Sequence, residues 1–143
     1  MAGPNGVSSS TGNRFLDLVP SDTRDRLLDA VTPHQLVEGE ILHESGQPIS
    51  AVYLPTTGII SLLAVTPSGS AVEAGIVGRE GFAGIPGVLG RDAPRNTRSM
   101  SQIRGAALKV ETKIFVEAME SSEALDRLVN AYINAVWSET AQI

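Results

Sequence analysis

Glycine and arginine are concentrated in the segment Val77–Arg104, which reads VGREGFAGIPGVLGRDAPRNTRSMSQIR. Glycine lets the backbone adopt positive φ and approach a ligand closely, and successive backbone N–H groups in such a turn form an anion-binding concavity. An arginine at the exit, such as Arg98, adds a fork of donors that suits a phosphate. The segment therefore has the residue types of a small phosphate-binding loop, without the Walker or dinucleotide glycine pattern. A turn-rich connector between strands explains the same residues equally well.

Histidine, cysteine and serine show no comparable pattern. The sequence has no cysteine and two histidines, His34 and His43. A metal-dependent enzyme needs a cluster of histidine and carboxylate ligands, whereas these two residues fall at an expected helix end and an expected strand turn. No Gly-x-Ser-x-Gly turn is present to expose a serine nucleophile. The sequence therefore predicts neither an enzyme nor a metal site.

The composition is that of one aliphatic domain with an acidic balance. The chain has 143 residues, of which 42% are hydrophobic and 4% aromatic, and its formal net charge is -5. This length suffices for a sizeable core, and the negative charge argues against a protein that grips nucleic acid by itself. No apolar run is long enough to cross a bilayer, and no signal-peptide pattern begins the chain. We therefore expect a cytoplasmic protein that does not use a membrane.

Turn residues divide the middle of the chain into short apolar segments. Residues 1–13 are rich in glycine and serine and predict a disordered leader. Two short helical pieces are expected over residues 14–31, interrupted by Pro20 and ended by Pro33. Strands are expected over 35–42, 51–54, 59–65, 71–77, 99–103 and 106–110. This spacing favours an antiparallel β-roll or jelly roll, in a mainly β fold class with flanking helices.

Helical periodicity returns after the last expected strand. Thr112 is expected to cap a helix over residues 113–119, and Ser121 or Ser122 to cap a long helix that starts at Glu123. The second helix keeps an i, i+3, i+4, i+7 apolar stripe as far as the last residues. We divide the chain into one domain over residues 14–122 and the start of a long helix over residues 123–143.

The far end of this terminal helix carries large apolar side chains that a small roll would leave uncovered. They are Tyr132, Ile133, Val136 and Trp137. Packing on the domain's own core explains the first half of the stripe, but for this second half we predict a coiled-coil-like homodimer seam. The helical pattern reaches Ile143 without a C-terminal cap, a glycine or a proline to end it, so we expect the helix and the natural protein to continue beyond this residue.

The order of these elements resembles the cyclic-nucleotide-binding sensor domain of the Crp/Fnr-type transcription regulators, over about residues 15–143. Four features carry the resemblance: the turn Leu42–Gly46, Gly58 after the second expected strand, the run Gly78–Gly87, and the pair Arg98-Ser99. The resemblance implies a β-roll with N-terminal helices and a long C-terminal helix. It also implies a homodimer, and DNA contact through a C-terminal domain that these residues do not include.

The resemblance further implies a phosphate-binding site for a small anionic effector, with cyclic AMP or another cyclic nucleotide as candidates. The residues that match it are Gly84, Ile85, Gly87, Arg98 and Ser99, with Thr140 on the terminal helix as a candidate contact to the base. The family typically has Gly-Glu where this sequence has Gly84-Ile85, and isoleucine cannot accept a hydrogen bond from the ribose. Pro86 also removes a backbone N–H. An unpaired ligand hydroxyl costs about 1–3 kcal/mol, which keeps a different anionic effector in consideration.

Two interpretations from different classes remain open at this point. The first is a sensor domain whose ligand repositions the terminal helix and, through it, the DNA-binding part. The second is a ligand-independent dimerisation or interaction module in which the phosphate site has decayed. The first requires Arg98 to point inward at an anion. The second expects an apolar side chain such as Ile85 to fill the space and Arg98 to pair outward with a carboxylate such as Asp92.

Overall fold

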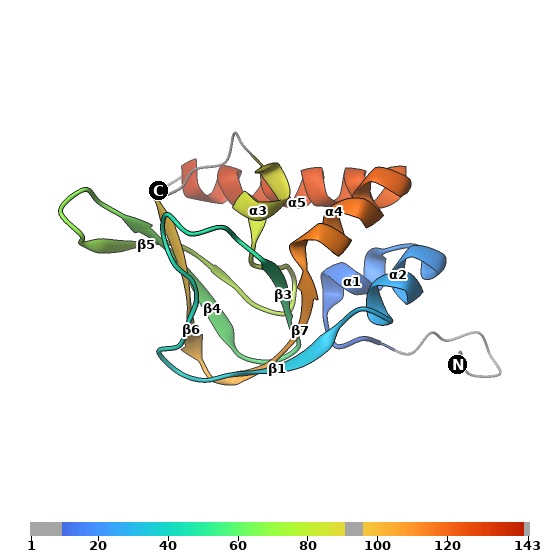
Figure 1. Cartoon of the computed structure of the whole chain (residues 1–143), viewed down its shortest axis with the longest axis horizontal. Helices are drawn as coiled ribbons and strands as arrows, with labels where there is room; N and C mark the ends of the chain where they lie inside the picture. Colours follow the sequence, from blue (N-terminus) through green and yellow to red (C-terminus); the bar gives the residue numbers. More distant parts are fainter. Residues whose placement is uncertain (1–9, 91–95, 142–143) are drawn as a thin grey trace.

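Two antiparallel sheets form a roll, and helices gather along one side and at one end of it (Figure 1). The computed structural model describes residues 10–90 and 96–141, with side chains as far as Val136. One sheet has the strand order β1-β7-β3 and the other β2-β6-β4-β5. The predicted fold class, a mainly β antiparallel roll with N-terminal helices and a long C-terminal helix, is confirmed.

The strands are β1 (Thr32–Leu36), β2 (Ile41–His43), β3 (Ala51–Pro55), β4 (Ile59–Val65), β5 (Ala71–Val77), β6 (Thr97–Ile103) and β7 (Gly105–Glu111). The helices are α1 (Arg14–Leu18), α2 (Ser21–Leu28), α3 (Ile85–Leu89), α4 (Thr112–Ser121) and α5 (Glu123–Ala141). Within the described residues, no helix is both long and apolar enough to span a bilayer.

Strand β6 is central to the four-stranded sheet because it pairs with β2 on one side and β4 on the other. In this register, Ser99 lies opposite His43 of β2 and opposite Leu62 of β4. Successive residues of a strand point to opposite faces. Thr97 and Ser99 therefore share one face of β6, and Arg98 points to the other.

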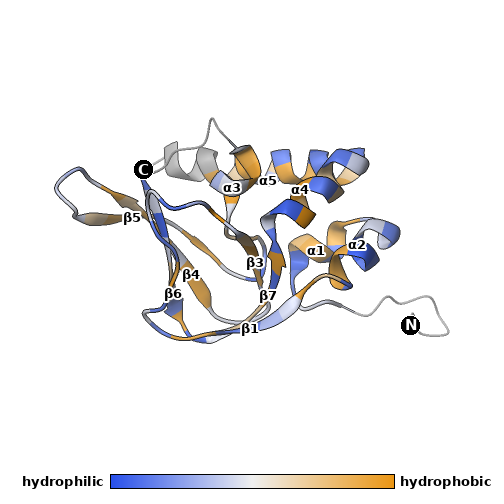
Figure 2. Cartoon of the chain, viewed as in Figure 1, coloured by the Kyte–Doolittle hydropathy of each residue, from blue (hydrophilic) through white to orange (hydrophobic). Residues whose placement is uncertain are grey.

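The main core lies between the helices and the three-stranded sheet. Hydrophobic stretches of α1, α4, β3 and β7 meet there (Figure 2). Phe82 is fully buried at its centre, and its ring lies 5.1 Å from that of Phe15, 5.3 Å from that of Phe115 and 4.9 Å from that of Tyr132. A second cluster, including Leu36, lies between the two sheets. Although aromatic residues are scarce in the sequence, this group of rings joins the helices to the roll.

The expected single strand over residues 35–42 is wrong. It is two strands, β1 and β2, which belong to different sheets. The break lies at Gly39, whose φ of +85° is a conformation that favours glycine, and the Glu40 N–H donates to the Val37 carbonyl across the turn at 2.9 Å. The local sign of the break is Gly39 itself, which lies between the apolar pairs Leu36-Val37 and Ile41-Leu42.

The expected leader over residues 1–13 is wrong at its C-terminal end, while residues 1–9 lie outside the described residues. Asn13 is fully buried, and its side-chain oxygen accepts a hydrogen bond from the Leu16 N–H at 2.9 Å, which caps α1. Its amide nitrogen donates to the Pro55 and Gly81 carbonyls, each at 2.9 Å. Asn13 therefore fastens the start of the domain to two distant segments of the roll.

The predicted helix caps are correct in one case and wrong in another. Ser122 caps α5 as expected, accepting a hydrogen bond from the Leu125 N–H at 3.2 Å. Thr112 does not cap α4: the N-cap position belongs to Glu111, and the buried Thr112 hydroxyl has no hydrogen-bond partner among the described residues. The glycine-rich segment also contains the short helix α3, where the sequence predicted only a turn.

Candidate functional site

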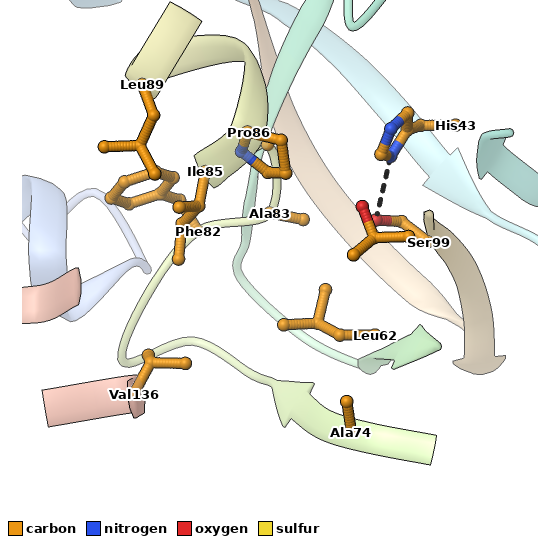
Figure 3. A pocket seen from close by; sticks show the side chains of 12 residues that line it. His43, Leu62, Ala74, Phe82, Ala83, Ile85, Pro86, Leu89, Ser99 and Val136 are labelled. Carbon is orange, nitrogen blue, oxygen red and sulfur yellow. Dashed lines mark hydrogen bonds between the residues drawn. The ribbon is translucent and has the colours of Figure 1, made fainter. Parts of the chain in front are cut away.

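A cavity of about 170 Å³ lies between the four-stranded sheet, the segment that leads into α3, and α5 (Figure 3). The sheet contributes side chains from β2, β4, β5 and β6, and α5 contributes one. The lining residues are His43, Leu62, Ala74, Phe82, Ala83, Gly84, Ile85, Pro86, Leu89, Thr97, Ser99 and Val136. The cavity therefore joins segments that lie far apart in the sequence and includes part of the glycine-rich segment.

The walls of the cavity are largely apolar. Leu62 and Ala74 point into it from the sheet, and Ile85, Pro86 and Leu89 border it on the side of α3 (Figure 3). Ile85 is 7% exposed and belongs to the main core. No lysine, arginine, aspartate or glutamate is among the twelve lining residues. Burial of a charge without a partner is costly, so this lining suits an uncharged occupant.

One wall carries the polar groups, which come from β2 and β6. The Ser99 hydroxyl lies 3.3 Å from His43 Nδ1, and Ser99 is 4% exposed. The Thr97 hydroxyl oxygen is buried and has no hydrogen-bond partner among the described residues. Burial lowers the pKa of His43, and the neighbouring Glu44 carboxylate opposes this only in part. His43 is therefore a neutral imidazole near pH 7 and, with the hydroxyls, gives the wall neutral hydrogen-bonding groups.

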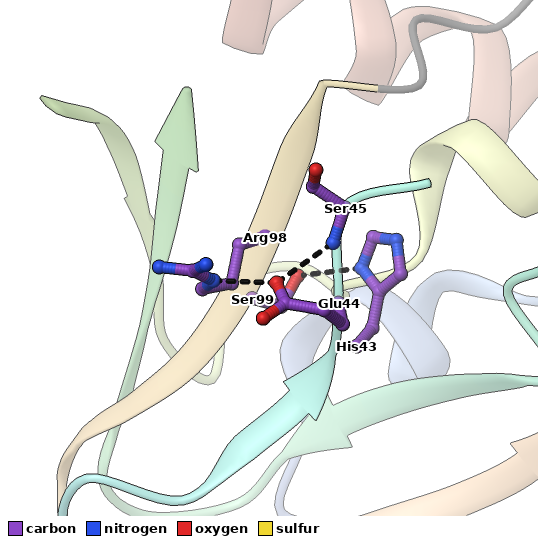
Figure 4. Close-up of polar contacts among 5 residues, drawn as sticks. All are labelled: His43, Glu44, Ser45, Arg98 and Ser99. Carbon is purple, nitrogen blue, oxygen red and sulfur yellow. Dashed lines mark hydrogen bonds and ion pairs between the residues drawn. The ribbon is translucent and has the colours of Figure 1, made fainter. Parts of the chain in front are cut away.

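The predicted phosphate pair, Arg98 and Ser99, is divided between the two faces of β6. Arg98 does not line the cavity; its Nε donates to Glu44 Oε2 at 2.6 Å on the opposite face (Figure 4). The same carboxylate oxygen accepts a hydrogen bond from the Ser45 N–H at 2.8 Å. The Arg98 and Ser45 hydrogen bonds lower the pKa of Glu44, and the Glu44 hydrogen bond raises that of Arg98. Arg98 is thus in an outward ion pair, with Glu44 in the place expected for Asp92, which lies outside the described residues.

The two glycines predicted to bind the ligand, Gly84 and Gly87, have different surroundings. Gly84 lines the cavity with φ of +121°, and a Cβ there would lie 3.2 Å from the Ala51 carbonyl oxygen. Gly87 does not line it, because it faces Ile49, whose side chain would lie 2.9 Å from a Cβ at this position. The glycines therefore allow close packing of α3 against the roll. Of the predicted ligand residues, the cavity includes Gly84, Ile85 and Ser99.

Three of the four residues predicted to form a dimer seam, Tyr132, Ile133 and Val136, contact the core or the cavity of this chain. Ile133 is 5% exposed and belongs to the main core, so its prediction as an interface residue is wrong. The Tyr132 ring packs at a tilt on that of Phe82, and Val136 lines the cavity. For these three residues the roll does offer a core, because the segment around Phe82 meets α5. The side chains of Trp137 and Thr140 lie outside the described residues.

Several residues that line the cavity were not predicted as ligand residues from the sequence. They include His43, Leu62, Ala74, Phe82, Thr97 and Val136. One signal was available for Thr97, because the two-residue period of a strand separates it and Ser99 from Arg98. The contributions of β2, β5 and α5 depend on long-range packing. The two histidines lie in different sheets, and His34 Nε2 lies 3.2 Å from Glu40 Oε1. Within the described part of the chain, no group of three or more potential metal ligands occurs.

Comparison with known proteins gives matches in structure only. No family model and no curated protein matches the sequence. The sensor domain of the transcriptional regulator DNR from Pseudomonas aeruginosa matches with a TM-score of 0.69 at 12% identity, over 91% of this chain and 87% of that one. The c-di-GMP-responsive global regulator CLP of Xanthomonas campestris matches with a TM-score of 0.70 at 14% identity, over 86% of this chain and 62% of that one.

A protein kinase regulatory domain also matches. It is the regulatory domain of Toxoplasma gondii PKA, crystallised with cAMP, with a TM-score of 0.70 at 16% identity over 86% of this chain and 46% of that one. The chain therefore spans less than two thirds of the length of CLP and of the PKA domain. At these identities the likeness concerns the fold. The chain has the fold shared by Crp/Fnr-type sensor domains and cyclic-nucleotide-binding domains, as the resemblance of its sequence implied.

Proposed function

We propose that this chain is the ligand-sensing domain of a Crp/Fnr-type transcription regulator, with the cavity as the sensor site and α5 as the output element. One observation carries the proposal: α5 itself contributes Val136 to the lining of the cavity. An occupant of the cavity would therefore touch the roll and the terminal helix at once. DNA contact, through a part beyond Ile143, and a homodimer formed along α5 belong to the same proposal.

A second contact supports transmission from the cavity to α5. Phe82 lines the cavity, and the Tyr132 hydroxyl of α5 donates to its carbonyl at 3.4 Å. The Tyr132 ring also lies 5.8 Å from that of Phe15. A ligand that moves the segment around Phe82 would move the aromatic surface on which α5 rests. Such a ligand shifts the helix only if it binds one arrangement better than the other.

Cyclic nucleotides are candidate effectors because matching domains respond to c-di-GMP or were crystallised with cAMP. Three features of this chain oppose them. Arg98 is paired with Glu44 away from the cavity, Ile85 stands where the family has its ribose-binding glutamate, and Pro86 offers no backbone N–H. A sensor for a different effector agrees better with these residues.

A ligand-independent interaction module is the second candidate function. It is favoured by the buried Ile85 and by the outward Arg98–Glu44 ion pair, which together are the arrangement expected of a decayed phosphate site. In this case α5 would be a fixed part of the domain. The two functions differ in whether a change at the cavity reaches α5, and that can be measured on this chain.

Gly81→Ala tests the proposed transmission. A Cβ at this buried position would run into the end of the Tyr132 ring, so the ring must leave its place against Phe82. We expect faster backbone hydrogen exchange in α5 and a shifted emission of Trp137, the one tryptophan of the sequence, with the sheets unchanged. The cost in stability should be about 1–3 kcal/mol, as for other overpacked sites.

Gly75→Ala is the matched control, because a Cβ there meets only Leu62 Cδ1 at an ordinary 3.9 Å. It should leave the exchange of α5 and the emission of Trp137 as in the parent chain. If Gly81→Ala behaves like this control, α5 is insensitive to the segment beside the cavity. The sensor proposal then fails and the interaction module replaces it.

A further inference from the structure

We propose that the cavity binds a neutral molecule of single-ring size that carries one hydroxyl or carbonyl group, with its apolar body against Leu62 and Ile85 and its polar group toward Thr97 and Ser99. This inference rests on the proposed sensor function and names the class of its effector. It is carried by the size of the cavity, the chemistry of its walls, an unpartnered buried hydroxyl, and the position of the nearest charges.

The size of the cavity sets the size of the occupant. Its volume is about 170 Å³. An apolar cavity of about 150 Å³, lined by leucine, isoleucine and phenylalanine, stays dry and binds benzene. The cavity of this chain therefore accepts one six-membered ring with a small substituent. A cyclic nucleotide, which has a purine, a ribose and a cyclic phosphate, exceeds this volume and would extend beyond the lining residues.

The walls set the character of the occupant's body. Leu62 and Ala74 from the sheet, Ile85 and Leu89 beside α3, and Val136 from α5 surround the space with aliphatic carbon (Figure 3). Each Å² of apolar surface removed from water contributes about 25 cal/mol to the binding free energy, whatever the orientation of the ligand. A saturated or aromatic ring would thus bind to these walls, whereas a polyhydroxylated ring of the same size would lose its hydrogen bonds to water.

The polar wall sets the position of the occupant's polar group. The Thr97 hydroxyl oxygen is buried and has no hydrogen-bond partner among the described residues, although a buried hydroxyl without one is costly. Ser99 follows two residues later on the same face of β6, with His43 Nδ1 3.3 Å from its hydroxyl. A single ligand oxygen between Thr97 and Ser99 would give the Thr97 hydroxyl the partner it lacks.

The position of the charges makes the occupant neutral. Arg98, the neighbour of Ser99 in sequence, lies on the opposite face of β6, where its Nε donates to Glu44 Oε2 at 2.6 Å. His43, the one titratable side chain in the lining, is neutral near pH 7 because burial lowers its pKa. Among the described lining residues, none would supply a counter-charge to a carboxylate or an ammonium, which favours the neutral form of a ligand.

The test is a two-dimensional ¹H–¹⁵N NMR titration of the chain with three probes that share one ring. They are cyclohexanol, cyclohexanecarboxylate and cyclohexylammonium. We expect cyclohexanol to bind with a Kd on the order of 1 mM, with saturating shifts at the amides of Thr97, Ser99 and Ile85. The two charged probes should bind at least tenfold more weakly. Tighter binding of the carboxylate would overturn the inference in favour of an anionic effector.

Two variants locate the binding within the cavity. Ala74→Leu places a larger side chain into the space from the edge strand β5 and should abolish the cyclohexanol shifts, while Val72→Leu, exposed on the same strand, should leave them unchanged. Ser99→Ala should raise the Kd about tenfold through loss of one hydrogen-bond partner, and it remains decisive if Ala74→Leu does not fold.

Absence of saturating shifts, shifts that persist in a folded Ala74→Leu variant, or an unchanged Kd in Ser99→Ala would each overturn the inference. Such a failure is distinguishable from failure of the sensor function itself. If cyclohexanol does not bind while Gly81→Ala still alters α5, the transmission remains and only the effector class is wrong. If neither effect occurs, both proposals fall.

Discussion

Replacing Phe82 with alanine should lower the free energy of unfolding by about 3–5 kcal/mol, the range for large aromatic-to-alanine changes in well-packed cores. Phe82 is fully buried and its ring meets those of Phe15, Phe115 and Tyr132, which belong to α1, α4 and α5. The substitution removes the common surface on which three helices rest. Most domains have a stability of about 5–15 kcal/mol, so this loss is a large part of the total.

Chemical denaturation followed by circular dichroism measures this effect. Leu18→Ala is a suitable control, because Leu18 is 68% exposed and its truncation should change the free energy of unfolding by less than about 0.5 kcal/mol. A loss of under 1 kcal/mol for Phe82→Ala would show that the helices do not depend on this ring. The description of the aromatic cluster as the link between the helices and the roll would then be wrong.

Replacing Asn13 with alanine should cost about 2–4 kcal/mol. The substitution removes the cap of α1, worth about 0.5–2 kcal/mol, and leaves buried backbone groups without partners, at about 1–3 kcal/mol. The groups affected are the Leu16 N–H and the carbonyls of Pro55 and Gly81. Thermal unfolding of the variant should show the loss as a lower Tm.

Two further substitutions separate the contributions of Asn13. Asn13→Asp retains an oxygen that can cap α1 but has no amide to donate to Pro55 and Gly81, so we expect it to be almost as destabilising as alanine. Asn130→Ala removes an exposed asparagine whose side chain donates to the Asp126 carbonyl within α5, and should have little effect. Full stability of Asn13→Asp would mean that the two long-range hydrogen bonds contribute nothing.

Much of the fold could be predicted from local sequence. Strands β4 and β5 were predicted at their observed bounds, because both are apolar segments enclosed by turn residues such as Gly58 and Pro67. The start of α5 at Glu123 was likewise predicted from Ser122 and the apolar stripe that follows. These features depend on neighbours within a few residues, which is the range over which turn chemistry and periodicity act.

The site could be predicted only in part, because its geometry depends on distant pairings. Arg98 and Ser99 are adjacent in the sequence, yet the partner of Arg98 is Glu44 and the cavity takes only Ser99. Which face of β6 turns inward is decided by its register with β2 and β4. Asn13 illustrates the same limit, because a polar residue in a glycine- and serine-rich stretch carries no local sign that it will be buried.

The packing of α5 within the chain also depends on distant contacts. Tyr132, Ile133 and Val136 have the spacing of a dimer seam, and periodicity does not distinguish a partner helix from the chain's own core. The segment around Phe82 provides that core by reaching from the sheet to α5. In sequence, the same segment is part of the glycine-rich run that suggested a loop for an anion.

The most direct test of the central claim, that an apolar cavity communicates with α5, is hydrogen exchange of this chain measured by mass spectrometry. The measurement compares the free chain with the chain near saturation in cyclohexanol and with the chain in the same concentration of cyclic AMP. Cyclohexanol should slow exchange both in residues 82–89 and in residues 132–136, and cyclic AMP should slow neither. Protection by cyclic AMP alone, or protection of residues 82–89 without any change in α5, would contradict the claim.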